Sequence, residues 1–113
     1  MTESVVRNLM SKSATPTPPA VARALTALGE DISTWRRLRR LTSAQVAERA
    51  GLSRSTVASL ENGKGASLEN TLRIARALGV LDELAASIDP YATDVGRLRS
   101  EEILPKRVRH RRL

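Results

Sequence analysis

From residue 21 onward, apolar side chains recur at intervals of three and four, the spacing that places them on one face of a helix. In the stretch from about Val21 to Arg40 these positions are Leu25, Leu28, Ile32, Trp35 and Leu38. The pattern predicts one amphipathic helix whose apolar face, Trp35 included, packs inside the protein. Gly29 weakens a helix interior, so the pattern leaves open whether the helix breaks or begins there.

Four shorter helices are predicted after it. Their expected bounds are Ser43–Ala50, Arg54–Asn62, 68–78 and Val80–Ile88. Thr42 and Gln45 have the spacing of a capping box, in which each side chain accepts from the other residue's backbone N–H. The other expected start and stop signals are Ser53 and Ser67 as N-caps, Gly51 and Gly79 as helix ends, the loop 63–65, and Asp89-Pro90 as a stop. The expected inward residues are Val46, Ala47, Ala50, Val57, Leu60, Leu68, Leu72, Ile74, Ala75, Leu78, Leu81, Leu84 and Ala85.

Residues 25–88 contain no alternating pattern typical of a strand, so the predicted fold is all-α, a compact bundle of five helices. Residues 1–20 are expected to form a flexible N-terminal segment, because the run Ser11–Pro19 contains three prolines. Residues 21–88 form the predicted folded domain, and residues 89–113 a C-terminal extension with a basic tail. At 113 residues the chain has room for one domain.

Composition excludes several kinds of site. The chain has no cysteine and a single histidine, His110, so neither a thiolate site nor a histidine-based metal centre is expected. No Ser-His-Asp set and no phosphate-binding glycine loop is present, so we expect neither an enzyme nor a cofactor. No stretch has the length of a membrane span, and Met1–Met10 lacks the apolar core of a secretory signal, which predicts a cytoplasmic protein.

The formal net charge of +7 is spread unevenly. Residues 1–24 carry +2, residues 25–90 carry +1 and residues 91–113 carry +4. The basic residues of the last nine are Lys106, Arg107, Arg109, Arg111 and Arg112. This tail is expected to be disordered in isolation. Two roles for the tail are open. It either aids solubility alone, or it is an arm that contacts phosphates or an acidic protein surface.

Residues 43–62 have the form of a helix-turn-helix, two short helices joined by a tight glycine turn. Ala47 has to be small because the second helix crosses close above it. Gly51 permits the reversal of the backbone, and Val57 packs the second helix onto the first. A generic helical hairpin is the alternative interpretation of the same spacing.

The run from Thr42 to Gly79, TSAQVAERAGLSRSTVASLENGKGASLENTLRIARALG, resembles the lambda-repressor-like (Cro/XRE) helix-turn-helix family. The resemblance covers about residues 28–85, and LSRSTVASLENGK is its most specific part. It implies a bundle of five helices whose third helix enters the major groove of double-stranded DNA, and a homodimer that binds half-sites about one helical turn apart.

The resemblance also implies roles for individual residues. Base edges would be read by Arg54, Ser55, Thr56 and Ser59, and phosphates contacted by Asn62, Lys64 and the backbone N–H groups near Thr42 and Ser43. Position 43 departs from the family, which often has glutamine there, although Gln45 partly substitutes. Glu61 matches a family glutamate that pairs with an arginine of the first helix, here Arg36. That pair is expected to be structural, and removing one partner is expected to cost roughly 3–5 kcal/mol if it is fully buried.

The C-terminal run DPYATDVGRLRSEEILPKRVRHRR, residues 89–112, is similar to the endings of HipB-like antitoxins, which accompany HipA-type kinase toxins. This similarity implies a repressor that regulates its own operon and binds its toxin. Residues 89–113 would then serve toxin binding, dimer contacts or DNA-backbone contacts. The alternatives are a stand-alone XRE-type regulator, or a small basic RNA-binding protein, which here lacks aromatic platforms for stacked bases.

Overall fold

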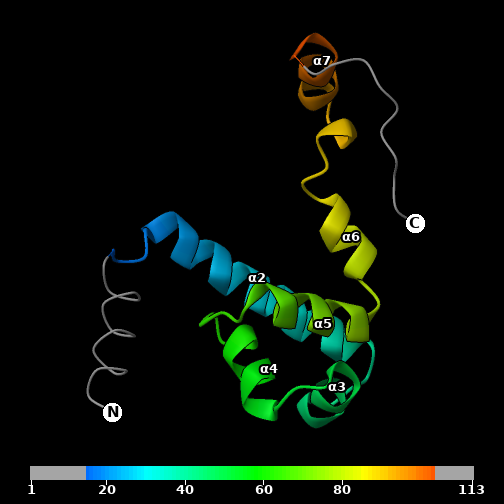
Figure 1. Ribbon diagram of the computed structural model, residues 1–113. Coiled ribbons are helices and arrows are strands. Elements are labelled where there is room, and N and C mark those ends of the chain that lie inside the picture. The colour runs from blue at the N-terminus through cyan, green and yellow to red at the C-terminus, as the bar shows by residue number, and fades with distance from the viewer. Residues whose placement is uncertain (1–14, 104–113) are drawn as a thin grey trace, which may run out of the picture.

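The computed structural model describes residues 15–103, and all regular structure in that part of the chain is helical, as predicted. The elements are α2 (Pro19–Leu38), α3 (Ser43–Ala50), α4 (Arg54–Glu61), α5 (Leu68–Leu78), α6 (Leu81–Ala86), the 3-10 helix η1 (Pro90–Ala92) and α7 (Asp94–Ile103). Figure 1 shows α2 to α5 gathered together, while α6, η1 and α7 lead away from them. None of the helices in this part of the chain has the length and apolar character needed to cross a bilayer.

The first long helix, α2, runs without interruption through Gly29, so neither a break nor a start occurs there. It begins at Pro19, two residues before the expected start, because proline suits the first helical position. Gly29 is buried where α2 meets the end of α4. A Cβ built on it would lie 2.7 Å from the Glu61 carbonyl oxygen and closer still to that of Leu60. The glycine therefore permits close packing of two helices.

The predicted N-caps of α3, α4 and α5 are confirmed. The Thr42 hydroxyl accepts from the Gln45 N–H at 3.1 Å, and the Gln45 side chain accepts from the Thr42 N–H at 2.8 Å. The hydroxyls of Ser53 and Ser67 each accept from the backbone N–H three residues on, at 3.2 and 3.0 Å. These bonds satisfy donors that a helix leaves free in its first turn, and so fix where each helix begins.

Four helices, α2 to α5, are followed by a residue in the left-handed conformation. After α3 and α5 that residue is glycine as predicted, Gly51 with φ 72° and Gly79 with φ 78°, and after α4 it is Gly63 with φ 78°. After α2 it is Arg40 with φ 58°, the one non-glycine residue of positive φ among residues 15–103. The helix therefore ends at Leu38, not at Arg40 as expected. Left-handed backbone costs a residue with a side chain roughly 1–2 kcal/mol, so this helix end is strained.

The core lies between α2, α3, α4 and α5. Its buried apolar residues are Ile32, Val46, Ala47, Ala50, Val57, Leu60, Ile74, Ala75 and Leu78. The expectation that the whole apolar face of α2 is inside is wrong, because Trp35 is 38% exposed and Leu38 65% exposed. The last turn of α2 passes beyond the core, and there the Trp35 ring is covered by the Arg39 guanidinium, 5.1 Å from the ring centroid.

Helix α6 is shorter than predicted and contributes no buried residue. It packs against α5, with Leu81 and Leu84 half-buried and Ala85 exposed, contrary to the expected inward positions. Leu68 is likewise exposed and Leu72 half-buried. Leu68 is exposed because it is the first residue of α5 and lies at the rim of the core. The compact core is therefore closed by α2 to α5.

The sequence did not predict α7. The helix packs on η1, where Gly96 comes against the backbone of Pro90, and the Thr93 hydroxyl accepts from the Gly96 N–H at 2.9 Å. Its large apolar side chains, Val95, Leu98 and Ile103, are exposed. A helix without a buried face gives little periodic signal, which is why pattern analysis missed it. Of the segment 1–20 that was predicted to be flexible, residues 1–14 lie outside the described part of the chain, while Pro19 and Ala20 belong to α2. The basic tail after Ile103 also lies outside the described part.

Candidate nucleic-acid interface

The two short helices α3 and α4 are held together by a glycine turn and by two small side chains. Gly51 donates its N–H to the Glu48 carbonyl at 3.2 Å, and the next N–H, of Leu52, reaches the Ala47 carbonyl at 2.9 Å. Ala47 is 3% exposed and Val57 fully buried, so α4 crosses α3 in close contact. The predicted roles of these residues in packing are confirmed, and the outer side of α4 is left facing solvent.

The first turn of α4 presents one cation and a group of hydroxyls. Arg54 is exposed, and none of the other described residues forms a hydrogen bond or ion pair with its guanidinium. The Ser53 hydroxyl lies 3.0 Å from that of Ser55 and 2.9 Å from that of Thr56. Ser55 is exposed and Thr56 half-buried. The cap therefore orients the neighbouring hydroxyls, while Arg54 keeps all five donors for an external acceptor.

Ser59 has a contact that the sequence did not predict. Its hydroxyl donates to the Gly65 carbonyl at 2.9 Å and so ties α4 to the loop before α5. The side chain is half-buried, and only its lone pairs remain for an outside donor. Ser59 therefore has a structural contact besides the base-reading role that the resemblance implies for it. This loop carries Lys64, whose side chain is exposed, next to the exposed Asn62.

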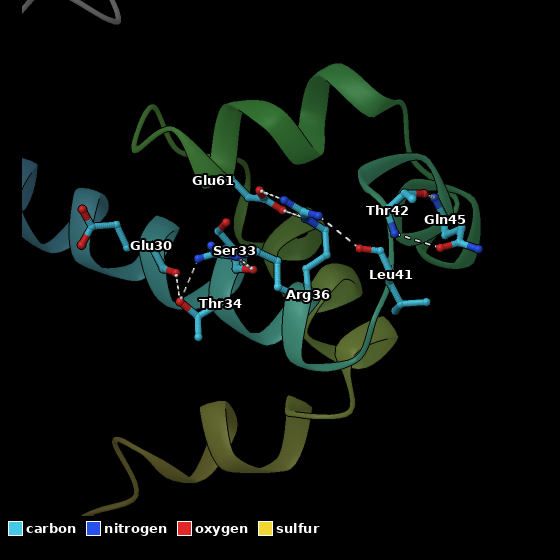
Figure 2. A network of polar contacts seen from close by, with 9 residues as sticks. Glu30, Ser33, Thr34, Arg36, Leu41, Thr42, Gln45 and Glu61 are labelled. Carbon is cyan, nitrogen blue, oxygen red and sulfur yellow. Dashed lines mark hydrogen bonds and ion pairs between the residues drawn. The ribbon is translucent and has the colours of Figure 1, made fainter.

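At the start of α3, the capping box occupies some of the groups expected to contact phosphate. The Thr42 N–H is bound by Gln45 Oε1, as Figure 2 shows, so this N–H has a partner within the fold. Gln45 keeps its side-chain NH₂ group for an external acceptor. Ser43 is half-buried at the first helical position. The remaining free donors at this end are therefore fewer than the resemblance implied.

The pair predicted between Arg36 and Glu61 is present and links three parts of the domain (Figure 2). Arg36 Nε donates to Glu61 Oε2 at 2.7 Å and Nη2 donates to Oε1 at 3.1 Å, a two-point contact between α2 and α4. Nη1 donates to the Leu41 carbonyl at 3.1 Å, which adds the segment before α3. The hydrogen bonds that Arg36 donates to Glu61 raise the pKa of Arg36 above its ordinary value, and desolvation only partly opposes this.

The exposed fractions of these two side chains are 18% for Arg36 and 10% for Glu61, so the pair is largely shielded from water. Removing one partner would leave the other charge without compensation, which is costly at partly buried sites. Because Arg36 neutralises Glu61, the carboxylate beside the exit of α4 does not repel an approaching phosphate. The pair thus fixes the position of α4 and removes an unfavourable charge from its exposed end.

Two further arginines connect the helices without having been singled out in the sequence. Arg39 Nε donates to the Leu78 carbonyl at 2.9 Å and joins α2 to the end of α5. Arg73 Nη2 lies 3.0 Å from Glu69 Oε2 in an ion pair within α5. Arg73 Nη1 donates to the Ala50 carbonyl at the end of α3, at 3.4 Å. Long side chains that return to backbone carbonyls leave no periodic signal, so only the fold shows that these cations have internal partners.

The arrangement is that of a helix-turn-helix unit, in which one short helix supports a second whose first turn faces outward. In agreement with this geometry, residues 32–83 match the protein-family model described as Helix-turn-helix. The match supports a helix-turn-helix domain in this part of the chain and a DNA-binding regulator as its class of protein. Neither the curated proteins nor the solved structures gave a significant match.

Proposed function

We propose that the protein is a sequence-specific transcriptional repressor that binds its operator as a homodimer in the cytoplasm. The observation that carries this proposal is the exposed Arg54 without an internal partner, at the first turn of a helix fixed on α3 and locked by Arg36 and Glu61. The second helix of such a unit enters the major groove with its N-terminal residues at the base edges. Ser55, Thr56 and Ser59 are the further candidates for base contacts, and Asn62, Lys64, Thr42, Ser43 and Gln45 for phosphate contacts.

We also propose that the protein has a specialised form of this function, as the antitoxin of a HipA-type toxin operon. Besides the resemblance of residues 89–112, the supporting observation is that α7 exposes Val95, Leu98 and Ile103. A contiguous exposed apolar patch marks a protein-binding surface, and the proposal is that these three side chains form one. A HipA-type kinase encoded beside the gene that copurifies with the protein would support this role. A neighbourhood without such a gene favours a stand-alone regulator.

RNA binding is the weaker alternative for the domain. An exposed aromatic ring is what a single-stranded base would stack on. Trp35 is partly exposed, but its ring is already covered by Arg39. The geometry therefore favours duplex DNA.

The experiment selects an operator from randomised duplexes and compares Arg54→Ala with Lys64→Ala. Arg54→Ala is expected to weaken operator binding by about 1–3 kcal/mol and to relax preference at one base pair, because a bidentate contact to guanine is lost. Lys64→Ala is expected to weaken binding to all DNA sequences about equally, since a phosphate contact carries no sequence information. Dissociation constants for the operator and for single-base variants measure both effects. Unchanged base preference in Arg54→Ala contradicts the assigned role of Arg54.

A further inference from the structure

The end of α2 differs from the ends of α3, α4 and α5 in one residue, although the four share a hydrogen-bond pattern. After α2 the Arg40 N–H donates to the Arg37 carbonyl at 3.0 Å, and the Leu41 N–H donates to the Arg36 carbonyl at 3.0 Å. The equivalent bonds after α3, α4 and α5 lie between 2.9 and 3.2 Å. In those three helices the left-handed position holds glycine, which adopts this conformation without steric cost. Only α2 places a long charged side chain there.

No contact of the Arg40 side chain within residues 15–103 compensates for this strain. Its three arginine neighbours each have internal partners: Arg36 binds Glu61, Arg37 binds the Ser33 carbonyl, and Arg39 binds the Leu78 carbonyl. Arg40 is exposed, and its guanidinium has no hydrogen bond or ion pair with any residue from 15 to 103. A strained residue that is not compensated within the fold indicates a function outside it.

The position of Arg40 indicates what that function is. It stands two residues before Thr42, the N-cap of α3, and its neighbour Leu41 is held through the Arg36 guanidinium that also binds Glu61 of α4. Arg40 is thus attached rigidly to the helix pair. The first helix of such a pair crosses the DNA backbone, so the residue leading into it lies beside phosphates. A guanidinium presents a planar set of donors that matches a phosphate group.

We propose that Arg40 is a phosphate-contacting residue of the DNA interface, retained at a helix end where glycine would be more stable. This inference rests on the proposed DNA-binding function and adds to it a residue outside the two short helices. The contact is independent of sequence, so it contributes to affinity and to its salt dependence, but not to base preference.

The test uses the full chain and four variants, Arg40→Gly, Arg40→Gln, Arg40→Lys and Arg76→Gln. Arg40→Gly removes strain and charge together and is expected to raise Tm by about 4–8 °C while weakening DNA binding about tenfold. Arg40→Gln removes the charge alone, so the same loss of binding is expected without the rise in Tm. Arg40→Lys keeps the charge and is expected to keep the salt dependence. Arg76 is an exposed arginine of α5 and serves as the control for net charge.

Binding is measured on a mixed-sequence duplex and on the selected operator between about 50 and 200 mM salt. The slope of log K against log salt is expected to become shallower by about 0.9 in Arg40→Gly and Arg40→Gln, and to stay unchanged in Arg76→Gln. Wild-type affinity and slope in Arg40→Gln overturn the phosphate contact. An equal change in Arg76→Gln attributes the effect to net charge and also overturns it. An unchanged Tm in Arg40→Gly contradicts the claim that Arg40 strains the end of α2.

These outcomes are separable from failure of the proposed function. If the full chain binds neither duplex, both inferences fall together. If Arg54→Ala loses base preference while the Arg40 variants bind normally, only the inference on Arg40 falls. If the Arg40 variants lose affinity on both duplexes while Arg54→Ala keeps its base preference, the phosphate contact stands and the readout by Arg54 does not.

Discussion

At the scale of single residues, Gly29 shows how packing overrides local preference. By helix propensity, glycine in the middle of a long helix is unfavourable by about 1 kcal/mol relative to alanine. The sequence therefore suggested a break or a start at this position. In the structure the α4 carbonyls of Leu60 and Glu61 come so close to Gly29 that no side-chain atom fits between them. The same residue that weakens the isolated helix is what lets two helices meet.

We predict that Gly29→Ala destabilises the domain by about 1–3 kcal/mol, because the added Cβ overpacks the contact between α2 and α4. Propensity alone predicts the opposite sign. Thermal unfolding followed by circular dichroism measures the change. The control is Ala24→Gly at an exposed position of the same helix, where a loss of about 1 kcal/mol is expected from propensity. A higher Tm for Gly29→Ala would contradict the close approach.

At the scale of elements, the helix ends were the most predictable feature of the chain. Capping depends on one side chain and on backbone groups two or three residues away, so its signal is entirely local. Ser53 and Ser67 make equivalent bonds at the starts of α4 and α5. The two helices differ in their first turns, because that of α4 carries Arg54 and the hydroxyls that contact Ser53, whereas α5 supports the core.

This difference gives a matched pair of variants. Ser53→Ala and Ser67→Ala should each cost about 1 kcal/mol of stability, the usual value of an N-cap. We predict that Ser53→Ala also weakens operator binding beyond this loss, since the first turn of α4 frays and Arg54 is no longer held in place. Denaturant unfolding and operator titration of both variants separate the two effects. Equal operator affinities in the two variants would place the first turn of α4 outside the interface.

At the scale of the whole molecule, positive charge and the helix-turn-helix unit are in different segments. The residues from 25 to 90 carry only +1 of the total +7, while residues 91–113 carry +4. Under the proposed function, specific recognition by a nearly neutral domain would depend on a few placed side chains such as Arg54. The basic residues beyond Ile103 supply a charge that either phosphates or an acidic protein surface can bind.

Deleting residues 105–113 distinguishes these two targets. If the tail contacts phosphates, we expect weaker binding to all sequences and a shallower salt dependence, because fewer counterions are released. Affinities of the full and shortened chains for operator and mixed-sequence DNA over a range of salt concentrations measure this. The unchanged base preference of the shortened chain serves as the internal control. An unaltered salt slope assigns the tail to a protein partner.

By itself, the sequence determined the helical class, the caps of α3 to α5, the glycine turn of the helix pair and the pairing of Arg36 with Glu61. These features arise from short-range spacing or from a motif, which are properties of the chain before it folds. It did not determine α7, the exposure of Trp35 and Leu38, or the reason for Gly29.

Only the tertiary structure decided those points, because each depends on which surfaces meet. It shows that Ser59 binds the Gly65 carbonyl, that the Thr42 N–H has a partner, and that Arg40 is strained where the three other such helix ends have glycine. Periodicity gives the apolar face of a helix but not how far along that face a neighbour extends. Contacts between residues distant in sequence carry no local signal, so they become visible only once the helices are placed together.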